Sequence, residues 1–227
     1  MQKLFYLLRD AAGADGDALR KTMLESAAPA IRASGAREIT VFAADRDVAA
    51  GKPIRRIDPP IRAMISFWLE DAGDRGPAEA ALRGVAKRID GYLVVESKPV
   101  VHAMPKGART PGMKQISCVT KRPDISQEEF IRIWHGDHKK VAVETQSTFG
   151  YVRNEIFRSL TPDAPQQWTA IVEESFPIGA LDDPHVFYDA KNEAEYQANF
   201  KRMMDSCGRF LDHAPIEVTF VSEYFLG

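Results

Sequence analysis

The chain has 227 residues, with 30 Lys and Arg against 32 Asp and Glu, a formal net charge of −2 and a hydrophobic content of 44%. This near-neutral balance argues against binding to nucleic acid, which needs a strong excess of basic residues on one face. The length allows one large domain or two of about 110 residues, with a sizeable core in either case. No window approaches the roughly 18 uncharged apolar residues of a membrane span, so no membrane contact is expected.

Two cysteines, Cys118 and Cys207, are present. They fit a reduced cytoplasmic protein with buried thiols, and they cannot build a zinc site alone. The apolar run at residues 4–8 is too short for the core of a signal peptide, and charge interrupts it early. We therefore expect a first β-strand here and a soluble, cytoplasmic protein.

The chain shows a weak internal repeat, in which the same order of elements occurs twice. Apolar alternation, helical periodicity and breaker residues predict β-α-β-β-α-β in each half. In the first half the expected elements are a strand at 3–8, a helix at 17–34, strands at 38–42 and 62–69, a helix at 77–89 and a strand at 92–95. In the second half they are a strand at 115–120, a helix at 126–145, strands at 151–157 and 168–173, a helix at 192–210 and a strand at 216–225.

The repeat predicts the organisation of the chain. Residues 1–101 and 113–227 form the two units, and the Pro- and Gly-rich residues 102–112 form a linker. A β-α-β-β-α-β unit folds as a ferredoxin-like antiparallel sheet with both helices on one face, which leaves the other face bare. The predicted fold class is therefore α+β, with two tandem ferredoxin-like units packed sheet to sheet as an α+β barrel within one chain. A pocket is expected between the sheets or between a sheet and its first helix.

The helix predicted at 126–145 carries the residues with the clearest chemical potential. It begins with a capping box, in which Glu129 follows Ser126 by three residues. At 100° per residue, one face carries an apolar stripe and two polar residues, whereas His135 points away. The residues on that face are Phe130, Trp134, Asp137, His138 and Val141.

Asp137 and His138 form a candidate proton-transfer pair. A carboxylate within an apolar stripe loses solvation unless a partner neutralises it. The adjacent imidazole has an ordinary pKa of about 6.5, so a cleft holding both groups could tune a proton donor or acceptor near neutral pH. The alternative is that His138 packs at the edge of the stripe with its nitrogens bonded to the backbone, while Asp137 turns to solvent.

The pattern Phe130-x-x-x-Trp134-x-x-x-His138, which follows "KRPDISQEEF" and precedes "GYVRN", resembles the EthD family of dimeric α+β barrel proteins. The later "CGRFLDHAPIEVTFVSEYF" is similar to the closing helix and strand of that family, so the resemblance covers roughly residues 114–225. Lys139 and Lys140 stand where the family often has Pro. The first half, 111 positions earlier, has Leu19 for Phe130, Met23 for Trp134 and Ala27 for His138, so it is interpreted as a degenerate copy that closes the barrel.

The resemblance implies a cofactor-independent dehydratase, tautomerase or decarboxylase that acts on a small apolar, aromatic or carbonyl-containing metabolite. His138 is the expected general acid/base, with Asp137 orienting it. Phe130 and Trp134 are expected to form the walls of the pocket. Tyr151 and Asn154 are candidate polar contacts, but strand alternation places them on opposite faces, and Tyr151 is favoured.

Two other functions remain open from the sequence. The first is a non-catalytic binding or accessory protein that uses the same pocket. The second is a haem-dependent protein, because related barrels hold haem through a helix histidine, although no C-x-x-C-H attachment motif occurs. The His135-x-x-His138 pair is a weak metal motif without further ligands, so no metal is expected. A homodimer is compatible with the sequence.

A small basic cluster remains unassigned. Residues 52–56, with the sequence KPIRR, lie near Arg62 in a loop of the first half. Solvated loop charge is the ordinary interpretation, and an anion contact is the alternative. In the second half, a long loop with Phe176, Phe187 and Tyr188 is a candidate lid for the pocket.

Overall fold

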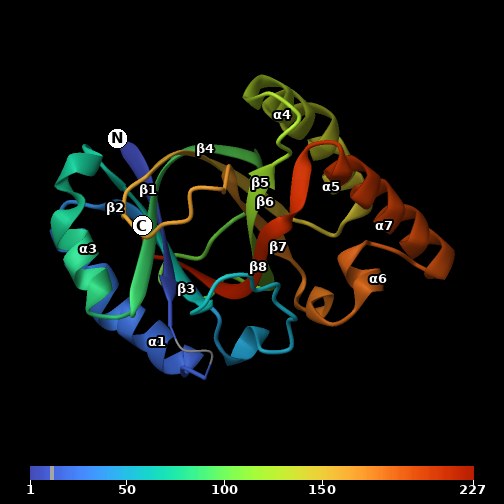
Figure 1. Cartoon of the computed structure of the whole chain (residues 1–227). Coiled ribbons are helices and arrows are strands. Elements are labelled where there is room, and N and C mark those ends of the chain that lie inside the picture. Colours follow the sequence, from blue (N-terminus) through green and yellow to red (C-terminus); the bar gives the residue numbers. More distant parts are fainter. Residues whose placement is uncertain (11–12) are drawn as a thin grey trace.

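The computed structural model describes residues 1–10 and 13–227, and its central feature is a closed barrel of eight antiparallel strands with helices on the outside (Figure 1). Each strand is hydrogen-bonded to two neighbours, in the order β1-β3-β2-β8-β5-β7-β6-β4. The strands are β1 (Gln2–Arg9), β2 (Arg37–Ala43), β3 (Ile61–Leu69), β4 (Arg88–Val100), β5 (Met113–Lys121), β6 (Gly150–Ser159), β7 (Ala170–Phe176) and β8 (Leu211–Phe225).

The barrel contains one four-stranded sheet from each half of the chain. The order is β4-β1-β3-β2 in the first half and β8-β5-β7-β6 in the second. The sheets meet edge to edge: β2 pairs with β8, with Val41 opposite Tyr224, and β4 pairs with β6, with Val94 opposite Ile156. The α+β class and the barrel were predicted, but the sheets are joined by main-chain hydrogen bonds instead of being stacked as separate layers. Free strand edges favour such pairing because their N–H and C=O groups need partners.

The helices of the two halves lie on opposite sides of the barrel (Figure 1). No helix in the described part of the chain is long and apolar enough to cross a membrane. The first-half helices are α1 (Gly16–Thr22), α2 (Ala28–Ala33) and α3 (Gly76–Arg83), and the second-half helices are α4 (Gln127–Ile133), α5 (Lys139–Thr145), α6 (Pro184–Phe187) and α7 (Glu193–Gly208).

A π-helical turn interrupts the long helix of each half. One turn, Met23–Ala27, joins α1 to α2, and the other, Trp134–His138, joins α4 to α5. The two turns are 111 positions apart, which equals the offset of the repeat predicted from the sequence. A π turn has i→i+5 hydrogen bonds and holds more residues than an α turn, and such turns are frequent at functional sites.

Strand alternation separates a barrel interior from an outer layer beneath the helices. On β1, Leu4 and Tyr6 belong to the core under the first-half helices, whereas Phe5 and Leu7 point into the barrel. All four side chains are fully buried. Apolar side chains therefore fill the middle of the barrel interior.

Buried ion pairs lie in the barrel interior on both sides of this apolar layer. Arg9 is fully buried and donates to Asp90 at 2.6 Å and to Glu217 at 2.5 Å. In the other cluster Lys114 pairs with Glu173 at 3.3 Å and also with Glu223, whose pKa is lowered to about 2 by Lys114 and by a hydrogen bond with His102, against the effect of burial. Ion pairing offsets the loss of hydration of these charges.

Several predicted boundaries shift because of barrel pairing. The helix expected at 77–89 ends at Arg83, since residues 88–100 all join β4. The last strand begins at Leu211 instead of residue 216. Both strands pair on two sides, which extends them beyond the apolar segments visible in the sequence. Between β4 and β5, residues 101–112 contain no helix or strand.

We expect Arg9→Met to lower the free energy of unfolding by about 3–5 kcal/mol, because it leaves Glu217 and Asp90 buried with one cation fewer. Urea unfolding monitored by circular dichroism measures this change. Arg158→Met is the matched control, since Arg158 is exposed on β6, and its effect should stay within about 0.5 kcal/mol. Equal midpoints for the two variants would show that the buried ion pairs do not stabilise the fold.

Candidate functional site

A pocket of about 180 Å³ lies between the outer face of the second-half sheet and the helices that cover it. Its floor comes from β5, β6 and β7, and its walls come from the π turn, α7 and the segments around them. The lining residues are Gln115, Ser117, Val119, Trp134, His138, Gln146, Tyr151, Val172, Glu174, Tyr188, Met203, Met204, Cys207, Phe210, Leu211, His213 and Ile216.

His138 lies at the end of the π turn with its side chain only 8% exposed. Its Nδ1 is 2.9 Å from the hydroxyl of Ser206 on α7, and its ring contacts the Phe210 ring edge-on at 4.7 Å. Nε2 has no hydrogen-bond partner among the described residues, so it is the nitrogen available to a ligand. Burial, with a smaller contribution from the Arg209 charge, lowers the pKa of His138 to about 4. The imidazole is therefore neutral at physiological pH.

Trp134 and Tyr151 form a polar contact within the apolar wall. The indole Nε1 donates a hydrogen bond of 2.7 Å to the Tyr151 hydroxyl, and both side chains are almost fully buried. Because its oxygen accepts from Trp134, the phenol keeps its own proton available for another acceptor. Phe130 does not line the cavity. It packs behind Trp134 and Phe210, with ring centroids 5.2 and 5.6 Å away.

The structure corrects the expected position of Asp137. Its side chain is 57% exposed and forms a 2.9 Å ion pair with Arg209 on the protein surface. The prediction assumed a uniform advance of 100° per residue, but the wider π turn advances each residue by a smaller angle. This rotation turns Asp137 away from the buried face and brings His138 into line with Trp134.

Glu174 is the pocket carboxylate that the sequence analysis missed. It lies on β7 between Gln115 of β5 and Tyr151 of β6, so the three side chains form a row across the sheet. The carboxylate has no ion-pair or hydrogen-bond partner in the described part of the chain, and desolvation raises its pKa to about 7. The signal was available, because Glu174 shares its strand face with Val172, which is apolar and buried.

Gln146 provides a polar atom that lacks a partner. It follows α5 directly, lines the pocket and is 7% exposed. Its side-chain Oε1 makes no hydrogen bond within the described residues. A buried acceptor in this state is unfavourable by about 1–3 kcal/mol, which a ligand N–H or O–H group would offset.

Asn154 lies on the opposite side of the sheet from the pocket. It is fully buried inside the barrel, where it donates to Glu173 at 2.9 Å and accepts from Lys3 at 2.8 Å. Alternation along β6 thus separates Tyr151 from Asn154, as the strand geometry required. Asn154 belongs to the internal charge cluster and has no contact with the pocket.

The pocket geometry bears on the metal and haem alternatives. In the described residues no three His, Cys, Asp or Glu side chains form a metal-binding group. His135 lies apart from His138, since its Nε2 is 3.2 Å from Glu155 on β6. For haem, a cavity of about 180 Å³ is smaller than the roughly 300–1,000 Å³ of ordinary cofactor pockets. The residues present therefore do not fit a haem in this conformation.

The family comparison covers the segment that builds this pocket. Residues 122–214 match the family model of the EthD domain. The match includes the π turn, β6, β7 and α7, and thus His138, Tyr151, Glu174 and Ser206. A comparison with curated protein sequences gives no match.

Solved structures are similar to this protein along most of the chain. The structure of an anthrone oxidase-like protein is 9% identical and covers 100% of this chain and 93% of its own, with a TM-score of 0.57. A chlorite dismutase variant from Candidatus Nitrospira defluvii is 8% identical and covers 97% of this chain and 90% of its own, with a TM-score of 0.49. At 9% identity, the similarity to the anthrone oxidase-like protein shows a shared fold alone, and a fold does not determine a reaction.

We expect His138 to make the protein sensitive to acid. Its pKa is lower in the folded state than the ordinary 6.5, so the unfolded state takes up the proton first and stability falls as the pH drops from 6.5 to 4. The loss is about 3 kcal/mol at an ordinary 1.4 kcal/mol per pKa unit. His138→Gln should lose correspondingly less between pH 7 and pH 4 in urea unfolding. His185→Gln, which changes an imidazole that is 38% exposed, should behave as the unmodified protein, and an identical loss in all three would contradict the prediction.

Proposed function

We propose that the EthD domain is a cofactor-independent enzyme of the lyase or isomerase type that moves a proton on a small apolar, aromatic or carbonyl-containing metabolite. The observation that carries this proposal is the presence of two proton carriers, His138 and Glu174, in one largely apolar pocket. Desolvation lowers the pKa of His138 and raises the pKa of Glu174, because burial disfavours the charged form of each group.

The opposite shifts suggest how the two groups divide the work. The pKa of His138 is about 4 and that of Glu174 about 7, the reverse of their usual order. Between these values the imidazole is neutral and can accept a proton, while the carboxylic acid is protonated and can donate one. Environments that separate two titrating groups in this way are a recurrent feature of acid/base sites.

Ser206 gives His138 a fixed orientation. If Nδ1–H donates to the Ser206 hydroxyl, Nε2 presents its lone pair to the pocket and acts as the base. Tyr151 and Gln146 supply a donor and an acceptor for the polar end of the substrate. The sequence analysis placed Asp137 beside the imidazole. In this scheme the role of Asp137 is limited to its surface ion pair with Arg209, the residue that precedes Phe210 in the chain.

The first half supports this site as a scaffold. Its sheet has the same strand order, and its π turn occupies the equivalent position with buried Met23 and Ala27 in place of Trp134 and His138. These parallels support an origin of the two units, residues 1–101 and 113–227, as tandem ferredoxin-like copies of which only the second keeps the imidazole.

The test begins with a thermal-shift screen of aromatic and carbonyl compounds on the full chain. For each compound that raises the melting temperature, proton NMR in D₂O follows conversion and exchange of protons next to the carbonyl. We expect His138→Gln and Glu174→Gln each to lower the rate by about 10²–10⁴. His185→Gln and Glu193→Gln, which alter exposed groups outside the pocket, should keep the full rate.

The pH dependence distinguishes the two roles. The value of kcat/KM should rise through a pKa near 4 as His138 loses its proton, and fall through a pKa near 7 as Glu174 ionises. In the pH profile of Glu174→Gln, the residual kcat/KM should not show the fall through a pKa near 7. Full activity in both pocket variants would remove these residues from the mechanism, and ligands that bind without exchange or conversion would favour the accessory binding role.

A further inference from the structure

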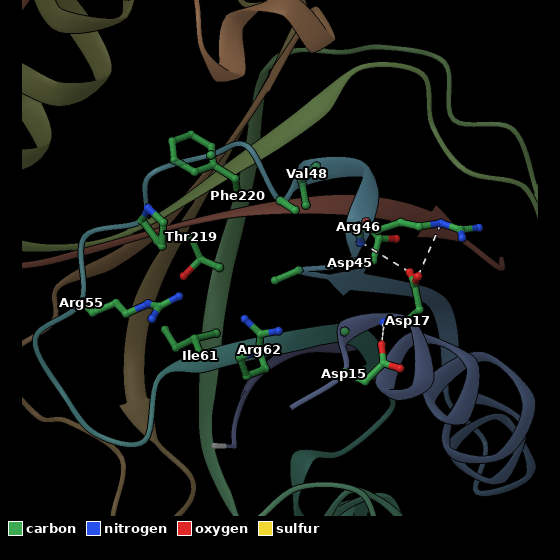
Figure 2. A pocket seen from close by; sticks show the side chains of 15 residues that line it. Asp15, Asp17, Asp45, Arg46, Val48, Arg55, Ile61, Arg62, Thr219 and Phe220 are labelled. Carbon is green, nitrogen blue, oxygen red and sulfur yellow. Dashed lines mark hydrogen bonds and ion pairs between the residues drawn. The ribbon is translucent and has the colours of Figure 1, made fainter. Parts of the chain in front are cut away.

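A second cavity, of about 300 Å³, lies in the first half of the chain (Figure 2). It is formed by the start of α1, the residues that follow β2, the loop at 51–56, the start of β3 and part of β8. None of its lining residues belongs to the pocket that contains His138. It includes the basic loop that the proposed function leaves unused.

The carboxylates of this cavity already have partners. Asp45 is buried and accepts from Arg20 at 2.9 Å, and from Ser222 at 2.8 Å. Asp17 pairs with Arg20 at 3.1 Å. It also pairs with Arg46 at 3.4 Å, a contact that Figure 2 shows at the helix end of the cavity. Asp15, the third carboxylate, accepts from the backbone N–H groups of Asp17 and Ala18 at 2.9 and 3.3 Å and has no ion pair among the described residues.

Two arginines on the other side lack such compensation. Arg55 forms no hydrogen bond or ion pair with any described residue. Arg62 donates from one terminal nitrogen to the Ala14 carbonyl at 2.8 Å, but its buried Nε has no partner in the described part of the chain. In Figure 2 both guanidinium groups point toward the middle of the cavity, with Thr219 beside them.

The two guanidinium groups are close enough to repel one another. Burial is the main cause that lowers the pKa of Arg62, and the charge of Arg55 lowers it further, against a smaller opposing effect of Asp10. Asp10 itself lies 3.7 Å from Lys87. Two converging like charges in a partly buried cavity are unfavourable until an anion lies between them.

The loop that carries Arg55 is held in place by β8. Ile54 and Val218 exchange two main-chain hydrogen bonds of 3.0 and 2.9 Å. The amides of Arg56 and Ile57 both donate to Glu217, at 3.0 and 3.2 Å. The main chain is therefore anchored on both sides of Arg55, which fixes where this side chain leaves the loop beside the cavity.

Two glycines allow the close packing that shapes the cavity. A Cβ on Gly51 would lie 2.6 Å from the Phe220 ring, and a Cβ on Gly16 would lie 2.1 Å from the Ala44 carbonyl oxygen. These approaches fix the loop against one wall and the start of α1 against the end of β2. The remaining walls include the apolar side chains of Val48 and Ile61.

We propose that Arg55 and Arg62 bind the carboxylate or phosphate group of a small organic anion, with its apolar part against Ile61 and Phe220. Guanidinium groups match both oxyanions, because their N–H groups form paired hydrogen bonds with two oxygens. The volume suits a ligand of about the size of a substituted benzene ring. This site lies outside the EthD match and is independent of the proton-transfer pocket.

Isothermal titration calorimetry on the full chain tests the site with three probes: benzoate, phenyl phosphate and uncharged benzamide. We expect one or both anions to bind and benzamide not to bind. Arg55→Gln and Arg62→Gln should each weaken anion binding at least tenfold. Arg56→Gln is the matched control, because it removes the same charge from the neighbouring exposed side chain, which does not line the cavity.

The outcomes separate the ligand classes. Binding of benzoate alone assigns a carboxylate ligand, and binding of phenyl phosphate alone assigns a phosphate ligand. Arg55 is exposed, so Arg55→Gln should fold normally and decides the matter even if Arg62→Gln is unstable. Absence of binding by both anions, or equal affinity in Arg55→Gln and Arg56→Gln, would overturn the proposal.

Discussion

Hydrogen bonding of β2 to β8 and of β4 to β6 joins the two sheets into a single closed barrel. This closure gives every strand two neighbours, and it divides each strand into one face toward a sealed interior and one face toward the helices. Apolar side chains such as Phe5 and Phe42 fill the interior between two groups of buried ion pairs. Space for a ligand therefore remains on the outside, beneath the helices and loops.

The two halves use this arrangement differently. In the first half Leu19, Met23 and Ala27 complete an apolar core under the helices. In the second half the equivalent positions hold larger and polar side chains. Trp134 is hydrogen-bonded to Tyr151, and His138 is hydrogen-bonded to Ser206. Polar groups in a buried layer need partners, and those supplied here still leave Nε2 of the imidazole and Oε1 of Gln146 for a ligand.

Burial also determines the charge state of the pocket. An apolar environment disfavours imidazolium and carboxylate alike, so His138 and Glu174 both tend toward their neutral forms. The first-half cavity has a different character, because Asp17 and Asp45 pair with Arg20 while Arg55 and Arg62 form no ion pair with a described residue. One barrel thus offers two chemically distinct environments outside its strands.

Residue patterns were sufficient for part of the candidate site. The capping box at Ser126 and the spacing of Trp134 and His138 correctly predicted a helix with these side chains on its buried face. Alternation along β6 also separated Tyr151 from Asn154. Asp137 was placed wrongly, because a π turn has no distinctive residue pattern. Glu174 was missed although its alternation with buried Val172 was visible, because the predicted strand ended at residue 173. Ser206 was missed because it reaches His138 from an element far along the chain.

The sequence by itself determined the order of strands and helices, because backbone geometry imposes periods of two and 3.6 residues on apolar positions. It also carries the similarity of residues 122–214 to the EthD family model. Only the tertiary structure decided which strand edges meet, which carboxylate lines the pocket and which arginines converge. These features depend on burial and on partners from distant segments, such as Ser206 for His138 and Val218 for Ile54, and no local pattern encodes such partners.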